Sequence, residues 1–378
     1  MAKKKILIVS SAFYPEISPR SFRATELAKE FVRQGHDVAV LTLFRGNAYD
    51  EFRKGNPNIE IKTFSPLRFP FFSNSGSGFI NLLKRGTNRI LSQLFEYPSI
   101  ELVFKVASAL KVEKNYDILI SVAVPHTIHW GVAKTWSENR RIAKVWIADC
   151  GDPYMGANLD SFKKMFYFKY IEKWFCRKTD FISIPFEGLQ NYFYPEFKNK
   201  IIVIPQGVRF ENIKRFDRPL NNSIPTFAFA GSIIPKIRDL KKFLQLLVSL
   251  NRSFKFTVYT RQAKYFEPFI KGLDGKLIIH DYIPREQLIY ELSKCDFLVN
   301  VDTIFDSENT LVAIPSKLID YALSGRPILN IHSDRHDLKT INEFLNGEYH
   351  NQRNIELSKY NIKNVAGQFL QLTDSKFN

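Results

Sequence analysis

A polar helix start in the second half of the chain is the first candidate site. Pro315 is followed by Ser316 and Lys317, which open a stretch with apolar residues at helical spacing. Free backbone N–H groups at a helix N-terminus carry partial positive charge, so a hydroxyl and an ammonium there can complete a phosphate-binding cradle. Gly325 suits the position just after a helix, and Pro327 prevents the helix from continuing. Spacing alone leaves an ordinary helix start as the alternative.

Two histidines follow a run that reads as a buried strand, Tyr116 to Val124. Sites in open α/β sheets lie at the carboxyl ends of strands, so His126 and His129 are candidates for catalysis or acceptor binding. We favour His126 as the catalytic residue and place His129 on the acceptor side. The alternative is that both rings only make local hydrogen bonds.

Two carboxylates and an arginine stand just after two other predicted strands. Asp149 and Asp152 stand in DCGDPY, at the end of the strand-like run Val145 to Asp149, and can orient an acceptor hydroxyl. Alternatively, Asp152 caps the turn before Pro153. Arg20 stands between the loop after the first strand and a predicted helix, and Arg23 lies within that helix; either one can meet acceptor or phosphate. An ordinary surface arginine is the alternative there.

Strand and helix patterns alternate along the chain, which predicts an α/β protein with parallel sheets. The first half opens with strands at Lys5–Ser10 and His36–Leu43 around a helix at Ser21–Gln34. Further strands are expected at these ranges: Tyr116–Val124, Val145–Asp149, Asp180–Pro185, Lys200–Pro205, Thr226–Ala230, Phe256–Thr260, Leu277–His280, Phe297–Val301 and Ile328–Ile331. The first loop lacks G-x-G-x-x-G, which argues against a nicotinamide or flavin enzyme.

The expected domain boundaries follow from composition. An N-terminal domain spans residues 1–207, and a polar, proline-bounded linker or hinge spans residues 208–225. A second α/β domain spans residues 226–354, and terminal helices within residues 355–378 can cross back to the first domain. A chain of 378 residues is long enough for two domains, each with its own core.

Charge and cysteine content limit the partners and the compartment. The net charge of +16 predicts a polyanionic partner, which can be nucleic acid, an anionic membrane or a phosphorylated substrate. Three scattered cysteines fit a reducing cytoplasm and neither a disulfide framework nor a zinc site. The N-terminus shows no secretory signal, and no apolar run reaches the roughly 18 residues that span a bilayer. We expect a cytoplasmic protein.

Two stretches mix basic and aromatic residues. Ile61 to Leu94 contains no Asp or Glu and reads as a mobile loop that runs into a basic amphipathic helix. Ser161 to Lys178 has six basic residues against one acid among many aromatic ones. Each is either an ordinary amphipathic helix or a docking element for the anionic inner face of the membrane.

Several segments resemble one family. PSKLIDYALSGRPIL is similar to the donor-site motif of retaining family 4 glycosyltransferases, in the form found in enzymes of bacterial surface-polysaccharide synthesis. DCGDPY resembles the D-x-R-D-P-W of such enzymes, with Cys150 and Gly151 before the second Asp, and IPQGV resembles their I-P-N-G-V. The resemblance implies the GT-B fold, in which two Rossmann-like domains with parallel sheets face each other across a cleft.

The resemblance also implies roles for individual residues. Arg238 and Lys317 neutralise the donor diphosphate as the nucleotide leaves, and Asp320 takes the place of a carboxylate that binds the ribose. Val312 stands where the first Glu of the motif is expected, so Glu308 or Asn309 can substitute from the preceding loop. The other donor contacts implied are the following: Gly231, Ser232, Tyr282, Ile283, Pro315 and Ser316.

We therefore expect a glycosyltransferase that moves a sugar, with retention, from a nucleoside diphosphate sugar to a lipid-linked or saccharide acceptor. The expected catalytic residues are Arg238, Lys317, His126 and Asp152. The chain has no D-x-D triplet, which fits a metal-independent reaction, and UDP is favoured over GDP as the donor nucleotide. The alternatives are a nucleotide-sugar epimerase of the same fold, a basic polyanion-binding protein without catalysis, and a family member that binds but no longer catalyses.

Overall fold

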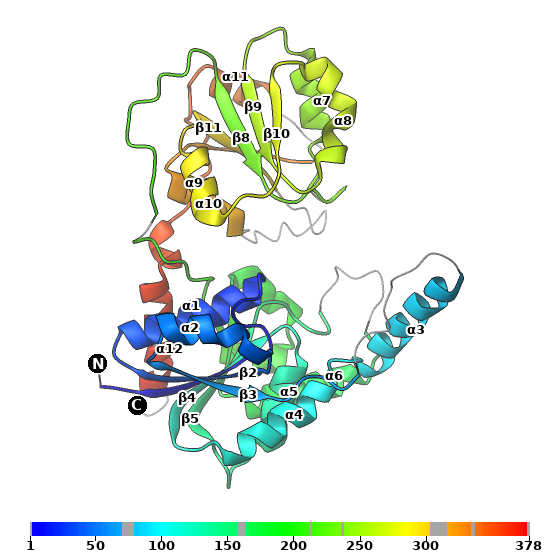
Figure 1. Cartoon of the computed structure of the whole chain (residues 1–378), viewed down its shortest axis with the longest axis vertical. Helices are drawn as coiled ribbons and strands as arrows, with labels where there is room; N and C mark the ends of the chain where they lie inside the picture. Colours follow the sequence, from blue (N-terminus) through cyan, green and yellow to red (C-terminus); the bar gives the residue numbers. More distant parts are fainter. Residues whose placement is uncertain are drawn as a thin grey trace. The chain divides into compact units, whose positions relative to one another are not determined.

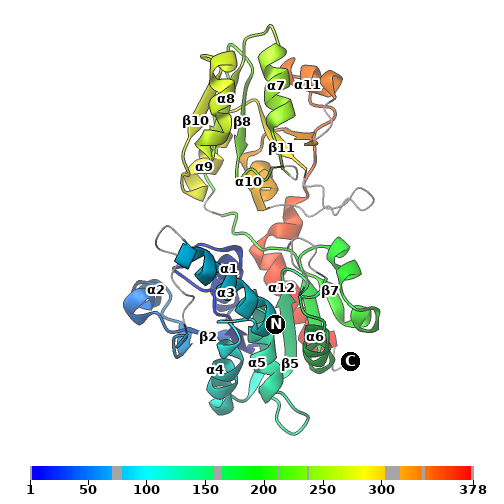
Figure 2. The same ribbon diagram turned by 90° about the vertical axis from the view of Figure 1, so that its right-hand side faces the viewer.

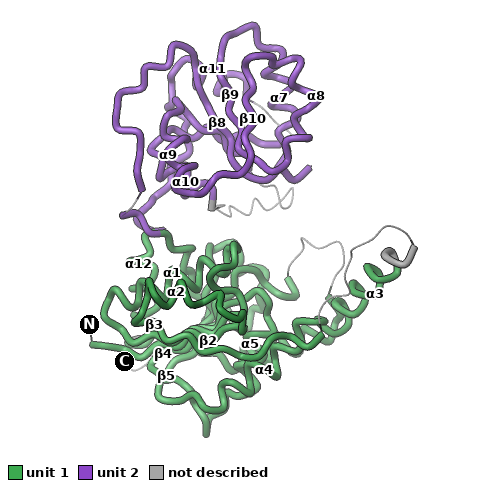
Figure 3. The backbone as a smooth tube through the Cα atoms, viewed as in Figure 1, with its two compact units in different colours: residues 1–208, 361–378 green, residues 209–360 purple. Residues whose placement is uncertain are grey.

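The chain folds into two α/β units in a computed structural model, drawn from two directions in Figure 1 and Figure 2 and coloured separately in Figure 3. The structure describes residues 2–69, 79–156, 164–211, 213–235, 238–302, 316–333 and 337–375. Unit 1 comprises residues 1–208 and 361–378, and unit 2 comprises residues 209–360. The C-terminal helix thus belongs to the same unit as the N-terminal strand.

A seven-stranded parallel sheet forms the centre of unit 1, in the order β3-β2-β1-β4-β5-β6-β7. Its strands are β1 (Lys5–Val9), β2 (Asp37–Leu43), β3 (Ile59–Phe64), β4 (Tyr116–Ala123), β5 (Ala143–Cys150), β6 (Phe181–Ile184) and β7 (Ile201–Val203). The order reverses between β1 and β4, which makes the carboxyl ends of these two strands the switch point of the sheet.

Helices cover both faces of this sheet. Alternate side chains of β1 supply the two cores, since Ile6 and Ile8 point to one face while Leu7 and Val9 point to the other. One core is completed by α1 (Pro19–Arg33), α2 (Asp50–Gly55) and α12 (Ile362–Ser375). The other is completed by α4 (Glu101–Ala109), α5 (Thr127–Thr135) and α6 (Phe168–Lys178). A further helix, α3 (Phe79–Phe95), extends away from the sheet in Figure 1.

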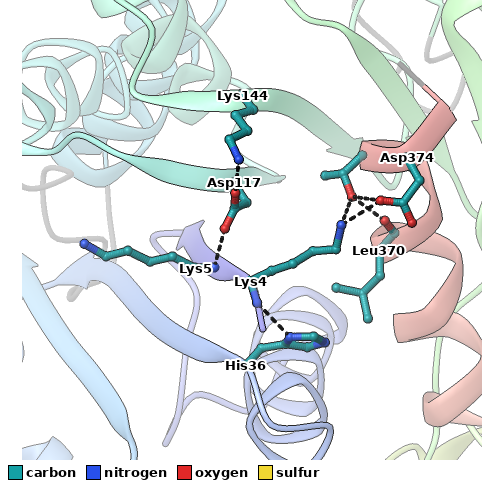
Figure 4. A network of polar contacts seen from close by, with 8 residues as sticks. Lys4, Lys5, His36, Asp117, Lys144, Leu370 and Asp374 are labelled. Atoms are coloured by element: carbon teal, nitrogen blue, oxygen red, sulfur yellow. Dashed lines mark hydrogen bonds and ion pairs between the residues drawn. The ribbon is translucent and has the colours of Figure 1, made fainter. Parts of the chain in front are cut away.

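Polar contacts fasten α12 to the start of β1 (Figure 4). The Lys4 ammonium donates to Asp374 Oδ1 at 2.8 Å and to the hydroxyl of Thr373, both on α12. The backbone N–H of Lys4 donates to Nδ1 of His36 at 3.1 Å. Lys5 N–H donates to the Asp117 carboxylate at 2.8 Å on the neighbouring strand β4. These contacts join the two ends of the chain within one unit.

Unit 2 contains a five-stranded parallel sheet in the order β10-β9-β8-β11-β12. Its strands are β8 (Thr226–Ala230), β9 (Lys255–Tyr259), β10 (Leu277–His280), β11 (Phe297–Val301) and β12 (Ile328–Ile331). One face packs on α7 (Lys241–Ser249) and α11 (Leu338–Leu345), and the other on α9 (Arg285–Leu292) and α10 (Ser316–Ser324). A single-turn helix, α8 (Glu267–Ile270), lies beside α7 (Figure 2).

The predicted strands are confirmed, with ends that differ by one or two residues, and the two parallel sheets confirm the predicted fold class. One prediction is wrong. The start of Ile61–Leu94 is not a loop, because Ile59–Phe64 forms β3 and Ile61 lies opposite Val40 of β2. The alternation of apolar and charged residues in this short edge strand hid it within a basic stretch. No helix among the described residues is long and apolar enough to cross a membrane.

Candidate functional site

The switch point of the unit 2 sheet lies between β8 and β11. Gly231 follows β8, Asp302 follows β11, and Lys317 stands in the first turn of α10. α10 begins at Ser316 and ends before Gly325, whose φ of +74° is the left-handed conformation predicted for it. The predicted helix start therefore lies beside the carboxyl end of the sheet, where open α/β proteins bind ligands.

The Lys317 ammonium is buried at this point. Nζ lies 4.7 Å from the ring centroid of Phe229 on β8 and has no hydrogen-bond partner in the described part of the chain. Burial lowers the pKa of Lys317 well below its usual value, and the positive charge of Arg238 lowers it further, while Asp302 acts in the opposite direction. An anion at this position would supply the missing partner and favour the charged form.

Gly231 brings backbone close to this lysine. Its φ is +129°, and a Cβ there would lie 3.6 Å from Cδ of Lys317. A hydrogen bond fixes the approach, because Ala230 N–H donates to the Tyr321 hydroxyl at 2.7 Å. Tyr321 is fully buried one helical turn after Lys317, on the same face of α10. The tyrosine thus holds the helix start against the end of β8.

The loop after β8 carries Arg238. Backbone groups of Ile234 and Arg238 pair with each other, at 3.1 and 2.7 Å, and the Gln262 side chain holds both backbone groups of Ile233. Arg238 is partly buried and acts electrostatically on Lys317. Ser232 is exposed in the same loop. The two predicted diphosphate ligands are therefore brought together, although they stand 79 positions apart in the sequence.

A polar network at the ends of β11 and β12 was not predicted. Arg353 pairs with Asp302 at 2.8 Å, and Asn330 donates to the same carboxylate. Asn300 donates to Asn330 Oδ1 at 2.6 Å and is itself fully buried. This network fixes Asp302, the acid that acts on Lys317. The sequence signal was limited to one asparagine in each of two predicted strands, since polar residues in buried strands need partners; their register, Asn300 opposite Asn330, comes from the structure.

The other predicted donor residues lie in several places. Asp320 Oδ1 accepts from Nε of Arg285 at 2.7 Å, which links α10 to α9. Tyr282 is exposed, with its ring 4.6 Å from the Arg261 guanidinium carbon, and the neighbouring Ile283 is half-buried. Ser316 begins α10. The other motif positions lie outside the described residues: Glu308, Asn309, Val312 and Pro315.

The switch point of unit 1 holds a second group of predicted residues. Arg20 is in the first turn of α1, after β1, and His126 directly precedes α5, after β4. The positive charges of Arg20 and Lys164 both act on the His126 ring. Asp152, in the loop after β5, is exposed, and its backbone carbonyl lies 3.0 Å from His126 Nε2. Arg20, His126 and Asp152 are therefore brought to one edge of the sheet.

His126 has one nitrogen available. A carbonyl oxygen can only accept, so His126 Nε2 must carry the proton that it donates to Asp152. Nδ1 is then an acceptor, and it is buried without a hydrogen-bond partner among the described residues. Burial lowers the pKa of His126 to about 4, despite the bond to Asp152, so the ring is neutral at neutral pH. A buried, neutral imidazole with Nδ1 as acceptor can accept a hydrogen bond from a hydroxyl, but a pKa of about 4 makes it a weak base.

His129 lies deeper in a hydrogen-bonded chain. Trp146 Nε1 donates to Ser121 Oγ at 2.8 Å, and Ser121 Oγ lies 2.8 Å from Nδ1 of His129. Nε2 of His129 is 3.4 Å from the Cys150 thiol. His126, His129 and Cys150 offer ligand atoms within 4.8 Å of one another, a donor set that a borderline metal ion can accept. Both nitrogens of His129 are already engaged, however, so the chain itself satisfies this ring.

Asp149 forms a buried ion pair. Its oxygens accept from Nε and Nη2 of Arg23 at 3.1 and 2.8 Å, and both side chains are 3% exposed. Ser183 donates to the same carboxylate at 2.7 Å, and Arg23 also donates to the backbone oxygens of Ile204 and Pro205. The pair joins α1 to β5 and β6. This placement gives Asp149 a structural role, and its predicted acceptor contact stays a prediction.

Comparison with known proteins identifies the family. A model of Glycosyltransferase Family 4 matches residues 22–212. Among solved structures, the chain is similar to a glycosyltransferase from Rickettsia africae ESF-5, with 13% identity, a TM-score of 0.61 and 99% of each chain covered. It is also similar to Alr3699/HepE of Anabaena in complex with UDP and glucose, with 10% identity, a TM-score of 0.57, and 98% of this chain and 100% of that chain covered.

A third similar structure is the apo form of the lipopolysaccharide outer core galactosyltransferase WaaB, with 11% identity, a TM-score of 0.58 and 99% of each chain covered. At such identities the likeness establishes the fold, which is the GT-B fold of these glycosyltransferases. No curated protein matches the chain significantly. The family model covers half of the sequence, and the chain therefore belongs to glycosyltransferase family 4.

Proposed function

We propose that this glycosyltransferase transfers a sugar, with retention, from a nucleoside diphosphate sugar to an acceptor used in bacterial surface-polysaccharide synthesis. The observation that carries the donor assignment is the Lys317 ammonium, which is buried without a hydrogen-bond partner in the described chain at the switch point of unit 2. Burying an unpaired cation is unfavourable, so its place at a ligand-binding edge favours an anionic ligand. Alr3699/HepE, solved with UDP and with UDP-glucose, supports UDP as the nucleotide.

Each residue of the donor site has a distinct part in this proposal. Gly231 lets the diphosphate approach the backbone, and Lys317 and Arg238 neutralise the charge that develops as the nucleoside diphosphate leaves. The exposed ring of Tyr282 packs beside the nucleotide base, and the Asp320 carboxylate binds the ribose. The leaving phosphate then helps to deprotonate the incoming hydroxyl on the same face of the sugar, which gives retention.

Unit 1 supplies the acceptor side. His126 Nδ1 accepts a hydrogen bond from the attacking hydroxyl, and Nε2, held by the Asp152 carbonyl, fixes the tautomer that leaves Nδ1 free. In this proposal His126 positions the acceptor hydroxyl. A nucleotide-sugar epimerase of the same fold is distinguished by activity in the absence of any acceptor.

Calorimetric titration tests the donor site directly. We would titrate the purified protein with UDP, GDP, ADP and CMP in the absence of added metal, and expect UDP to bind with one site per chain. Selective binding of UDP supports the proposal, and Lys317→Ala should then weaken it. Failure of every nucleotide to bind contradicts the donor assignment and favours a polyanion-binding role.

The membrane is the proposed second partner, at the cytoplasmic face. Leu83 and Ile90 lie seven residues apart on one face of α3, and both are more than half exposed. Three basic residues share this helix: Lys84, Arg85 and Arg89. The Tyr167 hydroxyl donates to the Leu94 carbonyl near the end of α3, which places the exposed Phe166 next to that end. Exposed apolar and basic side chains together favour an anionic bilayer surface.

Vesicle sedimentation tests this association. We expect the protein to sediment with vesicles that contain phosphatidylglycerol, less at high salt and less after Lys84, Arg85 and Arg89 are all changed to Gln. A matched control changes three exposed basic residues elsewhere in unit 1, which are Arg53, Lys54 and Lys111, to Gln. Equal loss in both variants would show a general charge effect, and binding independent of lipid charge would refute the proposal.

A further inference from the structure

Three side chains that commonly bind metal ions meet at the carboxyl edge of the unit 1 sheet. His126 and His129 stand three residues apart at the start of α5, and Cys150 is the last residue of β5. The ligand atoms of the three side chains all lie within 4.8 Å of one another. His126 is 5% exposed, and His129 and Cys150 are fully buried. Because the ligands come from two separate segments, the cysteine spacing in the sequence gave no sign of a metal site.

Each histidine ring is oriented by a hydrogen bond at one nitrogen. His126 Nε2 donates to the Asp152 carbonyl at 3.0 Å, which leaves the Nδ1 lone pair without a partner among the described residues. Nδ1 of His129 lies 2.8 Å from Ser121 Oγ, which also accepts from Trp146 Nε1 at 2.8 Å. With its proton on Nδ1, His129 donates to this oxygen and keeps a lone pair at Nε2. Histidines that bind metal ions have this arrangement, in which the second nitrogen donates to a fixed acceptor.

Two of the ligand atoms already have the separation that one zinc ion requires. Nε2 of His129 lies 3.4 Å from Sγ of Cys150. Zn–N bonds of about 2.0 Å and Zn–S bonds of about 2.3 Å at tetrahedral angles put such atoms about 3.5 Å apart. His126 has to approach by about 1 Å to complete the site, and one hydrogen bond to a backbone carbonyl allows this movement. The thiol is only a weak hydrogen-bond donor to His129, so a zinc ion displaces a weak contact.

We propose that His126, His129 and Cys150 form a zinc-binding site and that zinc bound there inhibits sugar transfer. Two imidazoles and one thiolate suit Zn²⁺, whereas Mg²⁺ and Ca²⁺ prefer oxygen ligands. Binding releases the thiol proton of Cys150 to solvent, and water completes the tetrahedral site. The ion takes the same His126 lone pair that positions the acceptor hydroxyl, which makes zinc an inhibitor and not a part of the reaction. The inhibition rests on the proposed function, and the zinc binding does not.

Metal titration of the full chain tests the site without any turnover. The protein is purified without a histidine tag and treated with a chelator, and we expect it to bind one Zn²⁺ per chain and no Mg²⁺. Co²⁺ serves as a spectroscopic probe, because a cobalt ion bound by a thiolate gives a charge-transfer band in the near ultraviolet. Cys150→Ala should abolish this band and weaken Zn²⁺ binding by at least about tenfold. His126→Ala should weaken Zn²⁺ binding and keep the band, since the thiolate remains.

The two other cysteines of the chain provide matched controls. Cys176 is a buried free cysteine of the same core, Cys295 is one of unit 2, and neither belongs to the set of ligands. Cys176→Ala and Cys295→Ala should bind Zn²⁺ and Co²⁺ like wild type. Loss of the band in Cys176→Ala, or unchanged Zn²⁺ binding in His126→Ala, would overturn the assignment of the ligands. Should Cys150→Ala fail to fold, a wild-type protein that binds Co²⁺ without the thiolate band overturns the proposal by itself.

Inhibition kinetics separate this inference from the proposed function. Zn²⁺ should raise KM for the acceptor in the wild type and leave KM for the UDP-sugar unchanged, and excess chelator should restore the rate. The ratio of rates with and without Zn²⁺ should be close to one in Cys150→Ala. Failure of Zn²⁺ to bind would overturn the inference and leave the proposed function standing, and binding without inhibition would overturn the inhibitory role. A protein that binds Zn²⁺ as expected but transfers no sugar from any donor would support the site and refute the proposed function.

Discussion

Replacing Lys317 with methionine should raise the free energy of unfolding of unit 2 and weaken the binding of UDP at the donor site. Methionine has nearly the length of lysine and is apolar, so it can occupy the same space against the Phe229 ring, where a sulfur–aromatic contact is favourable. The change removes a buried nitrogen that has no hydrogen-bond partner in the described chain. Stability and ligand binding should therefore move in opposite directions.

The size of each effect follows from two energies, which are the cost of burying the Lys317 ammonium without a hydrogen-bond partner and the energy of its hydrogen bond to a bound diphosphate. A buried polar group without a partner costs about 1–3 kcal/mol, so Lys317→Met should raise the free energy of unfolding of unit 2 by up to that amount. A charge-assisted hydrogen bond to the diphosphate contributes about 1.5–3 kcal/mol, so the Kd for UDP should rise roughly tenfold to 150-fold. Urea denaturation and calorimetry with UDP measure the two effects.

Proton uptake gives an independent check on the same residue. Burial lowers the pKa of Lys317 well below its usual value in the free protein, and a bound diphosphate favours the ammonium. At about pH 8 the phosphates of UDP are fully ionised, because their last pKa lies near 6. UDP binding should then take up a fraction of a proton, seen as a heat that depends on the ionisation enthalpy of the buffer. Lys317→Met should abolish this dependence.

Two results would refute this reasoning. One is a Lys317→Met protein that unfolds more easily and binds UDP as well as wild type, which would make the lysine a structural residue. The other is UDP binding without proton uptake in the wild type, which would mean that Lys317 is fully charged before the nucleotide arrives. Lys294→Met, which removes a half-exposed lysine of the same unit, is the control for loss of charge.

Three further predictions concern the supports of both sites. Tyr321→Phe leaves the N–H of Ala230 without its partner and should destabilise unit 2 by about 1–3 kcal/mol in urea denaturation; an unchanged midpoint would contradict this role. Arg23→Leu leaves the Asp149 carboxylate buried and unpaired, at a cost of about 3–5 kcal/mol, part of which Asp149→Asn in the same protein should restore. His126 has a pKa of about 4 folded and 6.5 unfolded, so its contribution of roughly 3 kcal/mol is complete above pH 6.5 and lost as pH falls to 4. His126→Gln should make the free energy of unfolding less dependent on pH between 4 and 6.5. An unchanged dependence on pH would show that the pKa of His126 is not lowered.

Local sequence patterns predicted the parts of the fold that depend on neighbours in the chain. The helix start at Lys317 and its end at Gly325 follow from spacing, because a helix and its caps involve residues within one or two turns. The strand Thr226–Ala230 and the glycine after it were equally readable. Parallel strands then bring Gly231 and Lys317 to one edge without any knowledge of packing.

Contacts between residues that are distant in the sequence could not be predicted. Arg23 and Asp149 are separated by 126 positions, and only the packed structure shows that they neutralise each other. The Asn300 network depends on strand register, which the sequence alone leaves open.

The most direct test of the central claim is mass spectrometry of the lipid fraction after incubation of the protein with UDP-sugars and lipid diphosphate saccharides. Our account predicts that one lipid acceptor gains the mass of a single sugar residue while UDP is released in equal amount. It also predicts that the new glycosidic bond keeps the anomeric configuration of the donor. Isomerisation of the nucleotide sugar without acceptor, or no reaction with any donor although UDP binds, would contradict it.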